Sequence, residues 1–189
     1  MSIRIETPLT PEVAKTLRAG DEVFLSGTIY TARDAAHKRL VEALDRGEAP
    51  PIPLQDAILY YVGPTPAKPG QVIGSAGPTT STRMDAYAPR LMAEGVRGML
   101  GKGRRSAEVI ERMKAHGAVY FGAIGGAAAL LAKCIVASEI VCYEDLGAEA
   151  IRRLTVQDFP ATVVIDAYGE NLYEIGVRRY LDAATVVVE

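Results

Sequence analysis

The sequence predicts a single α/β domain over residues 1–189, in which strands and helices of mixed order pack in layers. A hydrophobic fraction of 49% in 189 residues is sufficient for one buried core. Short runs with strand-like and helix-like spacing follow one another without strict βαβ alternation. The sequence contains no internal repeat and no low-complexity segment. These patterns predict the fold class but not the order of the strands.

The first third of the chain contains two predicted helices and a strand. Residues 10–20 open with Thr-Pro-Glu, which combines an N-cap residue, a proline and an acidic residue in the order typical of a helix start. Residues 22–27 alternate between apolar and polar side chains and predict a strand. Residues 31–47 carry alanine and leucine at helical spacing. We therefore expect a helix that Thr31 caps, with Arg33 in its first turn.

The middle of the chain alternates between short elements and turns. Residues 58–62 and 71–76 are predicted strands, and a Pro- and Gly-rich turn joins them. Residues 82–95 are expected to form a helix despite Pro89. Residues 96–103 then predict a strand that ends in glycines.

The last third continues the same mixture. Residues 106–117 predict a helix that is capped by its first serine. Residues 118–126 are expected to run from a strand into a Gly-rich loop, and residues 135–143 to form another strand. Residues 161–176 predict a final hairpin that turns about Gly169–Asn171.

Composition excludes several classes of function. The net charge of −2 favours neither nucleic acid nor an anionic membrane, so any anion binding must be local. No apolar run approaches the roughly 20 residues that span a bilayer, and the N-terminal residues lack the apolar core of a signal peptide. We expect a cytoplasmic protein. The only cysteines, Cys134 and Cys142, match no zinc or iron–sulfur spacing, so we expect no metal site in this chain.

The stretch AGPTTSTRMD, residues 76–85, is the first that suggests chemistry. A Gly-Pro kink is followed by four hydroxyl side chains, which lead into the predicted helix, where backbone N–H groups are unpaired. Arg83 follows at once, and its planar guanidinium suits a carboxylate. The segment therefore suggests an anion site. An ordinary helix cap beside a solvated arginine is the alternative.

Two further segments place cations at similar positions. Lys102 lies between two glycines just before a predicted helix, although the spacing is not that of a Walker A loop. Arg33 and His37 lie four residues apart on one predicted helix. A basic surface loop and a solvated helix face are the respective alternatives. Because all three segments lie at strand-to-helix junctions, together they suggest a dicarboxylate or phosphate ligand.

Four motifs in order, GTIYTARDAAHKRL, SAGPTTSTRMD, GMLGKGRRS and VYFGAIGGAAALLA, carry a specific resemblance. The chain resembles the beta subunit, or C-terminal domain, of class I iron–sulfur fumarate hydratases and the related L-tartrate dehydratases, from about Leu9 to Gly176. The resemblance implies a swivelling β/β/α domain with mixed sheets that closes over a larger alpha subunit in a hetero-oligomer. It also implies that the [4Fe-4S] cluster is held by the alpha subunit and not by this chain.

The resemblance also implies roles for individual residues. Arg33 and Arg83 correspond to residues that bind the substrate carboxylates, and Lys102 and Thr80 fall in the same pocket. Thr79 corresponds to the proposed base that removes a proton next to a carboxylate. Because a hydroxyl is a very weak acid, Thr79 needs close cations to stabilise an alkoxide.

The implied activity is the reversible hydration of fumarate to L-malate by a hydro-lyase that is active only with the alpha subunit. Dehydration of L-tartrate is the nearest alternative, because its substrate differs by one hydroxyl group. An alternative of another class is a non-catalytic regulatory subunit that binds a dicarboxylate.

The remaining polar residues of the motifs are expected to be structural. His37 is expected to pack on its helix or face a partner, and His116 suits the end of a helix because of the helix dipole. Asp34 is expected to orient Arg33 or a backbone group. No catalytic role is expected for the glycines, which allow close packing or approach of a ligand: Gly122, Gly125 and Gly126.

Overall fold

Among residues 2–123 and 127–185, which the computed structural model describes, seven strands form one mixed sheet in the order β1-β2-β3-β4-β5-β7-β6. The strands are β1 (Ile3–Glu6), β2 (Glu22–Thr31), β3 (Ile58–Tyr60), β4 (Gly98–Gly101), β5 (Val119–Gly122), β6 (Ile135–Cys142) and β7 (Ile151–Ile165). The helices are α1 (Pro11–Thr16), α2 (Asp34–Asp45), α3 (Ala88–Ala93), α4 (Ala107–His116), α5 (Ala128–Lys133) and α6 (Leu172–Thr185), with 3₁₀ turns η1 (Ser81–Met84) and η2 (Glu144–Glu149). The predicted α/β class is confirmed.

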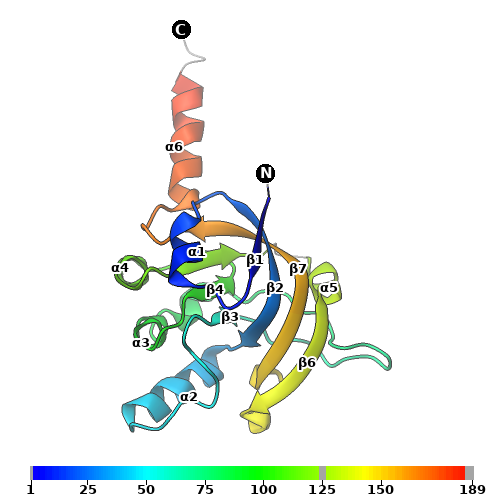
Figure 1. The fold of residues 1–189 in the computed structure, drawn as a ribbon. Helices are drawn as coiled ribbons and strands as arrows, with labels where there is room; N and C mark the ends of the chain where they lie inside the picture. The colour runs from blue at the N-terminus through cyan, green and yellow to red at the C-terminus, as the bar shows by residue number, and fades with distance from the viewer. Residues whose placement is uncertain (1, 124–126, 186–189) are drawn as a thin grey trace.

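The sheet divides into a parallel and an antiparallel layer. Strands β2, β3, β4 and β5 pair in parallel, whereas β7 is antiparallel to β2, β5 and β6. Because β7 pairs with both β2 and β5, the two layers are joined at both sides. Helices α2, α3 and α4 lie beside β3 and β4, on the side away from β6 and β7 (Figure 1). The resulting layers have the β/β/α order that the resemblance implies, whereas swivelling stays a prediction.

The core consists of two clusters on opposite faces of the parallel strands. Tyr60 and Phe121 belong to the cluster between the two strand layers. Tyr61 and Tyr120, their neighbours in sequence, belong to the cluster beneath the helices. Successive side chains of a strand point to opposite faces, so these strands are buried on both sides and read as continuous apolar runs.

Two predicted helix caps are confirmed. The Thr10 side chain accepts a hydrogen bond from the Val13 N–H at 3.4 Å. The Ser106 side chain accepts one from the Val109 N–H at 3.3 Å, and Gly117 ends α4 in the left-handed conformation.

The predicted cap at Thr31 is wrong, because strand β2 continues through this residue. The Thr31 hydroxyl is fully buried, donates to the Ala150 carbonyl at 3.2 Å and accepts from the Arg152 N–H at 2.9 Å. A β-branched residue held in this way fits a strand better than a helix cap. Helix α2 therefore begins at Asp34, and Arg33 lies at its N-cap.

Two predictions around residues 76–85, the hydroxyl loop, are also wrong. Residues 71–76 form no strand, because Thr65 binds Ser75 through both its backbone N–H and its hydroxyl and keeps this segment in a local loop. The predicted helix of residues 82–95 is divided into η1 and α3. Pro89 lies in the first turn of α3, where a missing N–H costs no hydrogen bond.

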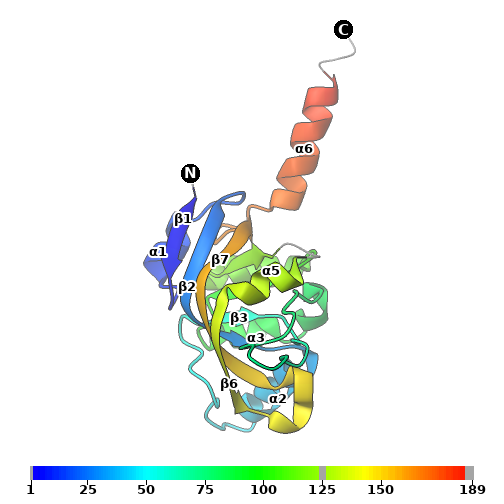
Figure 2. The ribbon, with the colours of Figure 1, turned by 90° about the vertical axis from the view of Figure 1, so that its right-hand side faces the viewer.

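The predicted final hairpin is replaced by a turn and a helix. Gly169 does adopt a positive φ of 86°, and Ile165 forms one bridge with Asn171. However, the Asn171 side chain accepts from the Tyr173 N–H at 3.1 Å, as an N-cap does, and helix α6 follows. This helix projects away from the rest of the chain (Figures 1 and 2). No helix within the described residues is both long enough and apolar enough to cross a membrane.

Candidate functional site

The predicted site residues lie at the carboxyl ends of three neighbouring parallel strands. Arg33 follows β2 by two residues, and Lys102 directly follows β4. The Thr79 N–H donates to the Tyr61 carbonyl, just beyond β3, at 2.7 Å. Ligands of open α/β sheets bind preferentially at this edge. The structure thus brings together the three segments that the sequence singles out.

The main chain of the hydroxyl loop is hydrogen-bonded to that of residues 101–103, the GKG loop. The Lys102 N–H donates to the Thr79 carbonyl at 3.3 Å, and the Ser81 N–H donates to the Lys102 carbonyl at 2.9 Å. Thr80 and Lys102 form a parallel bridge and are both exposed, whereas Thr79 is half-buried. This pairing holds the backbone of Lys102 beside that of the two threonines.

Gly101 is required where the two loops meet. A Cβ atom at this position would overlap the Ser81 hydroxyl and approach the Tyr61 ring to 3.0 Å. Only glycine leaves room for the Ser81 side chain and the Tyr61 ring against this part of the backbone.

The two arginines of the site share one carboxylate. Arg83 Nε donates to Asp34 Oδ1 at 2.6 Å, and Arg33 Nη2 lies 3.5 Å from Asp34 Oδ2. The Arg83 side chain is 53% exposed and that of Arg33 is 21% exposed. Asp34 therefore links the positions of the two guanidinium groups. Of the two roles expected for Asp34, this contact fits the orientation of Arg33 rather than of a backbone group.

The structure bears on two of the three alternative interpretations of these segments, whereas Lys102 is exposed and the alternative of a basic surface loop stays open. Thr80 is at the N-cap of η1, but its side chain makes no capping hydrogen bond. Arg83 is engaged with Asp34 rather than only solvated. The helix face that carries His37 is buried rather than exposed.

Sequence reasoning missed Glu149, which also positions Arg33. Glu149 Oε1 lies 3.3 Å from Arg33 Nη2, and Oε2 accepts from the Ala35 N–H at 2.9 Å. A carboxylate here complements both the guanidinium group and the N-terminal end of α2. Gly63 leaves room for this arrangement, because a Cβ atom there would lie 2.9 Å from Arg33 Nη1. No local pattern marks Glu149, since it lies more than 100 residues from Arg33 in the chain.

His37 is fully buried beneath the site. Its Nδ1 lies 3.0 Å from the Arg33 carbonyl, and its ring is T-shaped against Tyr61 at 5.1 Å. Burial lowers the pKa of His37 to about 4; the nearby Arg105 charge also lowers it, and the hydrogen bond to the Arg33 carbonyl opposes this shift. The ring is therefore neutral near pH 7, and Nδ1–H donates to the Arg33 carbonyl. This arrangement agrees with a structural role that supports the Arg33 backbone.

The His37 pKa predicts how stability depends on pH. The unfolded chain binds this proton below about pH 6.5, whereas the folded chain does not until about pH 4. Stability is therefore fully present above pH 6.5 and is lost as the pH falls towards 4. Changing His37 to Phe should remove about 2 to 3 kcal/mol of the difference in unfolding free energy between pH 7 and 4.5.

Urea unfolding of both proteins at the two pH values measures this difference. The carboxylates are the same in both proteins, so the change in pH dependence isolates His37. An identical pH dependence in the His37→Phe protein would contradict the assignment of a neutral buried imidazole.

The thiols of this chain do not suit an iron–sulfur cluster. Cys134 directly precedes the eight-residue strand β6 and Cys142 ends it, so the two thiols lie at opposite ends of this strand. An extended strand of this length spans on the order of 25 Å, which is too far for both thiols to bind one cluster. Burial raises the pKa of both thiols, which disfavours the thiolate that metals require. Within residues 2–123 and 127–185, no three or more His, Cys, Asp or Glu residues form a group that could hold a metal ion.

Gly122 ends β5 and pairs with Gly101 of β4, so it lies at the same edge of the sheet as Lys102. A Cβ atom at Gly122 would lie 2.7 Å from a methyl group of Val164, which accounts for glycine by close packing. Gly125 and Gly126 fall outside the described residues. His116 is the last residue of α4, as expected. A surface cavity of about 430 Å³ lies elsewhere, between residues 65–75 and the start of β6, and contains no predicted site residue.

Comparison with known proteins gives matches over most of the chain. Residues 1–176 match the family model described as Fumarase C-terminus. The chain is 45% identical over 152 residues to the aerobic class I fumarate hydratase of Escherichia coli strain K12, which covers 79% of this chain and 28% of that protein. It is 41% identical over 157 residues to fumarate hydratase 2 of Leishmania major, with 82% of this chain and 28% of that protein covered.

A shorter relative is matched over most of its own length. The chain is 38% identical over 172 residues to a putative L(+)-tartrate dehydratase subunit beta of Methanocaldococcus jannaschii, and the match covers 88% of each protein. In contrast, the chain spans less than a third of the length of the fumarate hydratases from E. coli and L. major.

Proposed function

Because this chain belongs to the family of fumarase C-terminal domains, we propose that it is the beta subunit of a class I hydro-lyase that interconverts fumarate and L-malate. Family membership, which the four sequence motifs predict, is confirmed by the family model and by the beta-subunit relative. The similarity to fumarate hydratases supports the choice of reaction, and the match to a separate beta subunit supports the choice of subunit role.

The observation that carries this proposal is the shared edge of Arg33, Arg83, Lys102 and the two threonines. A dicarboxylate needs two cationic clamps, and Asp34 keeps both guanidinium groups in fixed relation. Backbone pairing of the two loops places the backbone of a further cationic residue, Lys102, beside that of Thr79 and Thr80. In this proposal the arginines bind the substrate carboxylates, while Lys102 and Thr80 complete the binding site.

In this proposal Thr79 removes the proton next to a carboxylate. The developing charge moves into that carboxylate, which becomes a dianionic aci-carboxylate in the transition state. Fixed cations at this edge stabilise both the aci-carboxylate and the Thr79 alkoxide, because they need no reorganisation as the charge develops.

The edge is open, which supports a site completed by another chain. Lys102 and Thr80 are exposed, and more than half of the Arg83 side chain is accessible. We assign departure of the hydroxyl group to an alpha subunit, to which the resemblance also assigns the [4Fe-4S] cluster. The two distant thiols of this chain support that assignment.

Dehydration of L-tartrate is the second candidate. It is favoured by one observation, the match to a tartrate dehydratase beta subunit over 88% of its length. The same clamp suits both substrates, since tartrate and malate carry the same two carboxylates. A non-catalytic dicarboxylate-binding subunit is the candidate of another class.

Anaerobic mixing with the cluster-bearing alpha subunit tests the proposal. We expect the chain alone to be inactive on fumarate, malate and tartrate, and the complex to hydrate fumarate. Changing both Cys134 and Cys142 to Ser should leave the activity of the complex nearly unchanged.

Other outcomes distinguish the alternatives. Faster turnover of L-tartrate would assign the chain to the tartrate enzymes, and dicarboxylate binding without turnover would indicate a regulatory subunit. The proposal fails if the chain alone, supplied with iron and sulfide, binds a stoichiometric cluster and turns over any of the three acids.

A further inference from the structure

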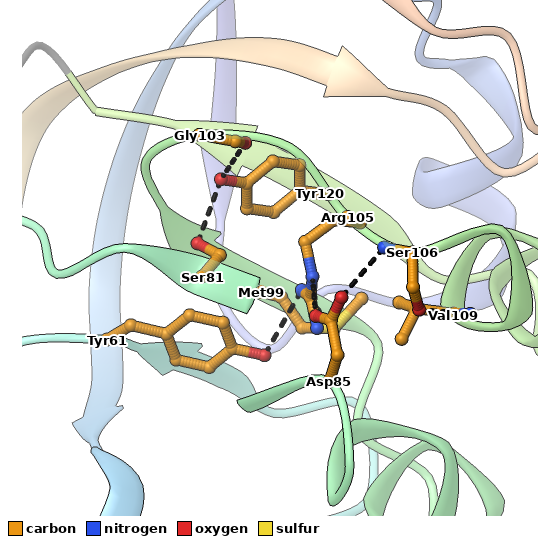
Figure 3. A network of polar contacts seen from close by, with 9 residues as sticks. All are labelled: Tyr61, Ser81, Asp85, Met99, Gly103, Arg105, Ser106, Val109 and Tyr120. Carbon is orange, nitrogen blue, oxygen red and sulfur yellow. Dashed lines mark hydrogen bonds and ion pairs between the residues drawn. The ribbon is translucent and has the colours of Figure 1, made fainter. Parts of the chain in front are cut away.

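A buried ion pair lies directly beneath the two paired loops (Figure 3). Arg105 Nε donates to Asp85 Oδ1 at 2.7 Å, and the Arg105 side chain is completely buried. Asp85 Oδ2 also accepts from the Ser106 N–H at 2.7 Å. Asp85 follows η1, so its carboxylate ties the end of the hydroxyl loop to the residues that follow the GKG loop.

The guanidinium group of Arg105 is surrounded by aromatic rings. It lies 5.4 Å from the centre of the Tyr61 ring and 5.3 Å from that of Tyr120. Its Nη1 contacts the Tyr61 hydroxyl at 3.4 Å, whereas its Nη2 is buried without a hydrogen-bond partner among the described residues. Burying a charge with an unpaired N–H is costly, and apolar side chains of similar volume often replace such pairs without loss of stability. A buried pair of this kind is therefore weak evidence for a stabilising role.

Tyr120 forms a second tie between the loops. Burial raises the pKa of its hydroxyl, which keeps its proton and donates to the Gly103 carbonyl at 2.9 Å. The Ser81 hydroxyl then donates to the Tyr120 oxygen at 2.9 Å. In Figure 3, the hydrogen bonds of Tyr120 and the Asp85–Arg105 pair lie close together, beside the rings of Tyr61 and Tyr120.

Both ties lie on the C-terminal side of the backbone contacts made by Lys102. Tyr120 binds residues 81 and 103, and Asp85 binds residues 105 and 106. Just before these points along each loop, the Lys102 N–H and carbonyl pair with Thr79 and Ser81. The network therefore restricts how far one loop can slide along the other.

We propose that the Asp85–Arg105 pair, together with Tyr120, is a positioning device that fixes Lys102 relative to the Thr79 and Thr80 hydroxyls. This role rests on the proposed function, because it concerns the site of that reaction. Asp85, Arg105 and Tyr120 contact the loops and not the substrate. Misplacement of a reacting group by about 1 Å can cost about a hundredfold in rate, so even a small slip of the loops is expected to be measurable.

The first test removes the charged pair while keeping the volume. In the complex with the alpha subunit, the double change Asp85→Leu with Arg105→Met should lower kcat by about 10- to 100-fold. The midpoint of urea unfolding should stay equal or rise. KM should change by a smaller factor than kcat, because Asp34 and Glu149 hold the two arginine clamps separately from Lys102. An unchanged kcat in this folded double variant would overturn the proposal.

The single change Asp85→Asn tests the pair if the double variant does not fold. It keeps the shape and an acceptor for the Ser106 N–H but removes the charge. We expect a loss of at least tenfold in kcat, and less than a threefold further loss when Lys102 is already changed to Met, since both changes act through the same group. Full additivity of the two losses would overturn the proposal.

A matched ion pair at the opposite end of β4 provides the control. Arg97 Nη2 and Asp56 Oδ1 are 3.0 Å apart, and both side chains are mostly buried. Arg97 precedes β4, whereas Lys102 follows it. The change Asp56→Asn should leave kcat unchanged, and a loss equal to that of Asp85→Asn would show a general effect of ion pairs and overturn the proposal.

Amide hydrogen exchange separates failure of this inference from failure of the proposed function. In the chain alone, Asp85→Asn should speed exchange of the Lys102 and Ser81 amides at least tenfold, while the Asp56→Asn protein should show normal exchange at both. If the unmodified complex turns over none of the three acids, the proposed function is wrong. The exchange rates of the Lys102 and Ser81 amides would still show whether the Asp85–Arg105 pair fixes the loops. Unchanged exchange at both amides would overturn the inference.

Discussion

Changing Thr79 to Val is expected to abolish exchange with solvent of the hydrogen next to the malate carboxylate. Valine keeps the β-branched shape but lacks the hydroxyl, and removal of a general base typically costs 10² to 10⁴ in rate. The loop should survive, because Thr79 pairs with Tyr61 and Lys102 through its backbone N–H and carbonyl. Exchange is measured by NMR in deuterated water with the complex of both subunits.

Two further measurements make this prediction specific. Changing Thr79 to Ser restores a hydroxyl, so part of the activity should return. Dicarboxylate binding should be nearly the same in all three proteins, because the arginine clamps are intact. Exchange at the normal rate in the valine variant would exclude Thr79 as the base.

Changing Arg83 to Lys is expected to lower kcat/KM about a hundredfold, equivalent to about 2 to 3 kcal/mol of transition-state stabilisation. The lysine keeps the charge but loses the planar fork of donors. Arg83 uses Nε for Asp34, which leaves the far end of its guanidinium group for a carboxylate. A single ammonium group cannot serve both partners with the same geometry.

An arginine on α3 provides a matched control for this change. Arg90 is also paired with carboxylates, Asp45 and Glu94, and is partly exposed. Changing Arg90 to Lys should leave kcat/KM unchanged, since it lies outside the predicted site. Steady-state kinetics gives kcat/KM for both variants. An unchanged kcat/KM in the Arg83→Lys complex would exclude Arg83 from the site.

Local sequence signals predicted many elements correctly. Thr10 and Ser106 cap their helices as expected, because a cap depends on a hydroxyl and on N–H groups within three residues. The apolar runs at residues 58–62 and 118–126 contain strands β3 and β5. Such signals act over a few residues, so one sequence is sufficient to read them.

The wrong predictions fall where distant residues determine local structure. Thr31 looks like a helix cap in the sequence. In the structure its hydroxyl binds Ala150, which precedes β7, and Arg152 on β7, and the residue belongs to strand β2. Residues 71–76 were predicted to form a strand, but among the described residues they pair with no strand, and Thr65 binds them in a loop instead. Tertiary contacts thus override local propensity at these positions.

In the candidate site, too, local patterns mark some residues and distant contacts determine others. Arg33, Thr79, Arg83 and Lys102 could be singled out as candidates, because they belong to short motifs at predicted strand-to-helix junctions. Glu149 was not, since an acidic residue that pairs with a distant arginine looks the same in sequence as one that faces solvent.

By itself, the sequence determined the α/β class, the family, and the strand ends at which the polar motifs lie. These follow from periodicity, caps and motifs, each of which acts over a short stretch of chain. Only the tertiary structure decided the strand order, the pairing of β7 with both β2 and β5, and the use of Asp34 to join Arg33 and Arg83. The physical reason is that each depends on contacts between residues far apart in the chain, which form only when the buried faces of several elements pack together.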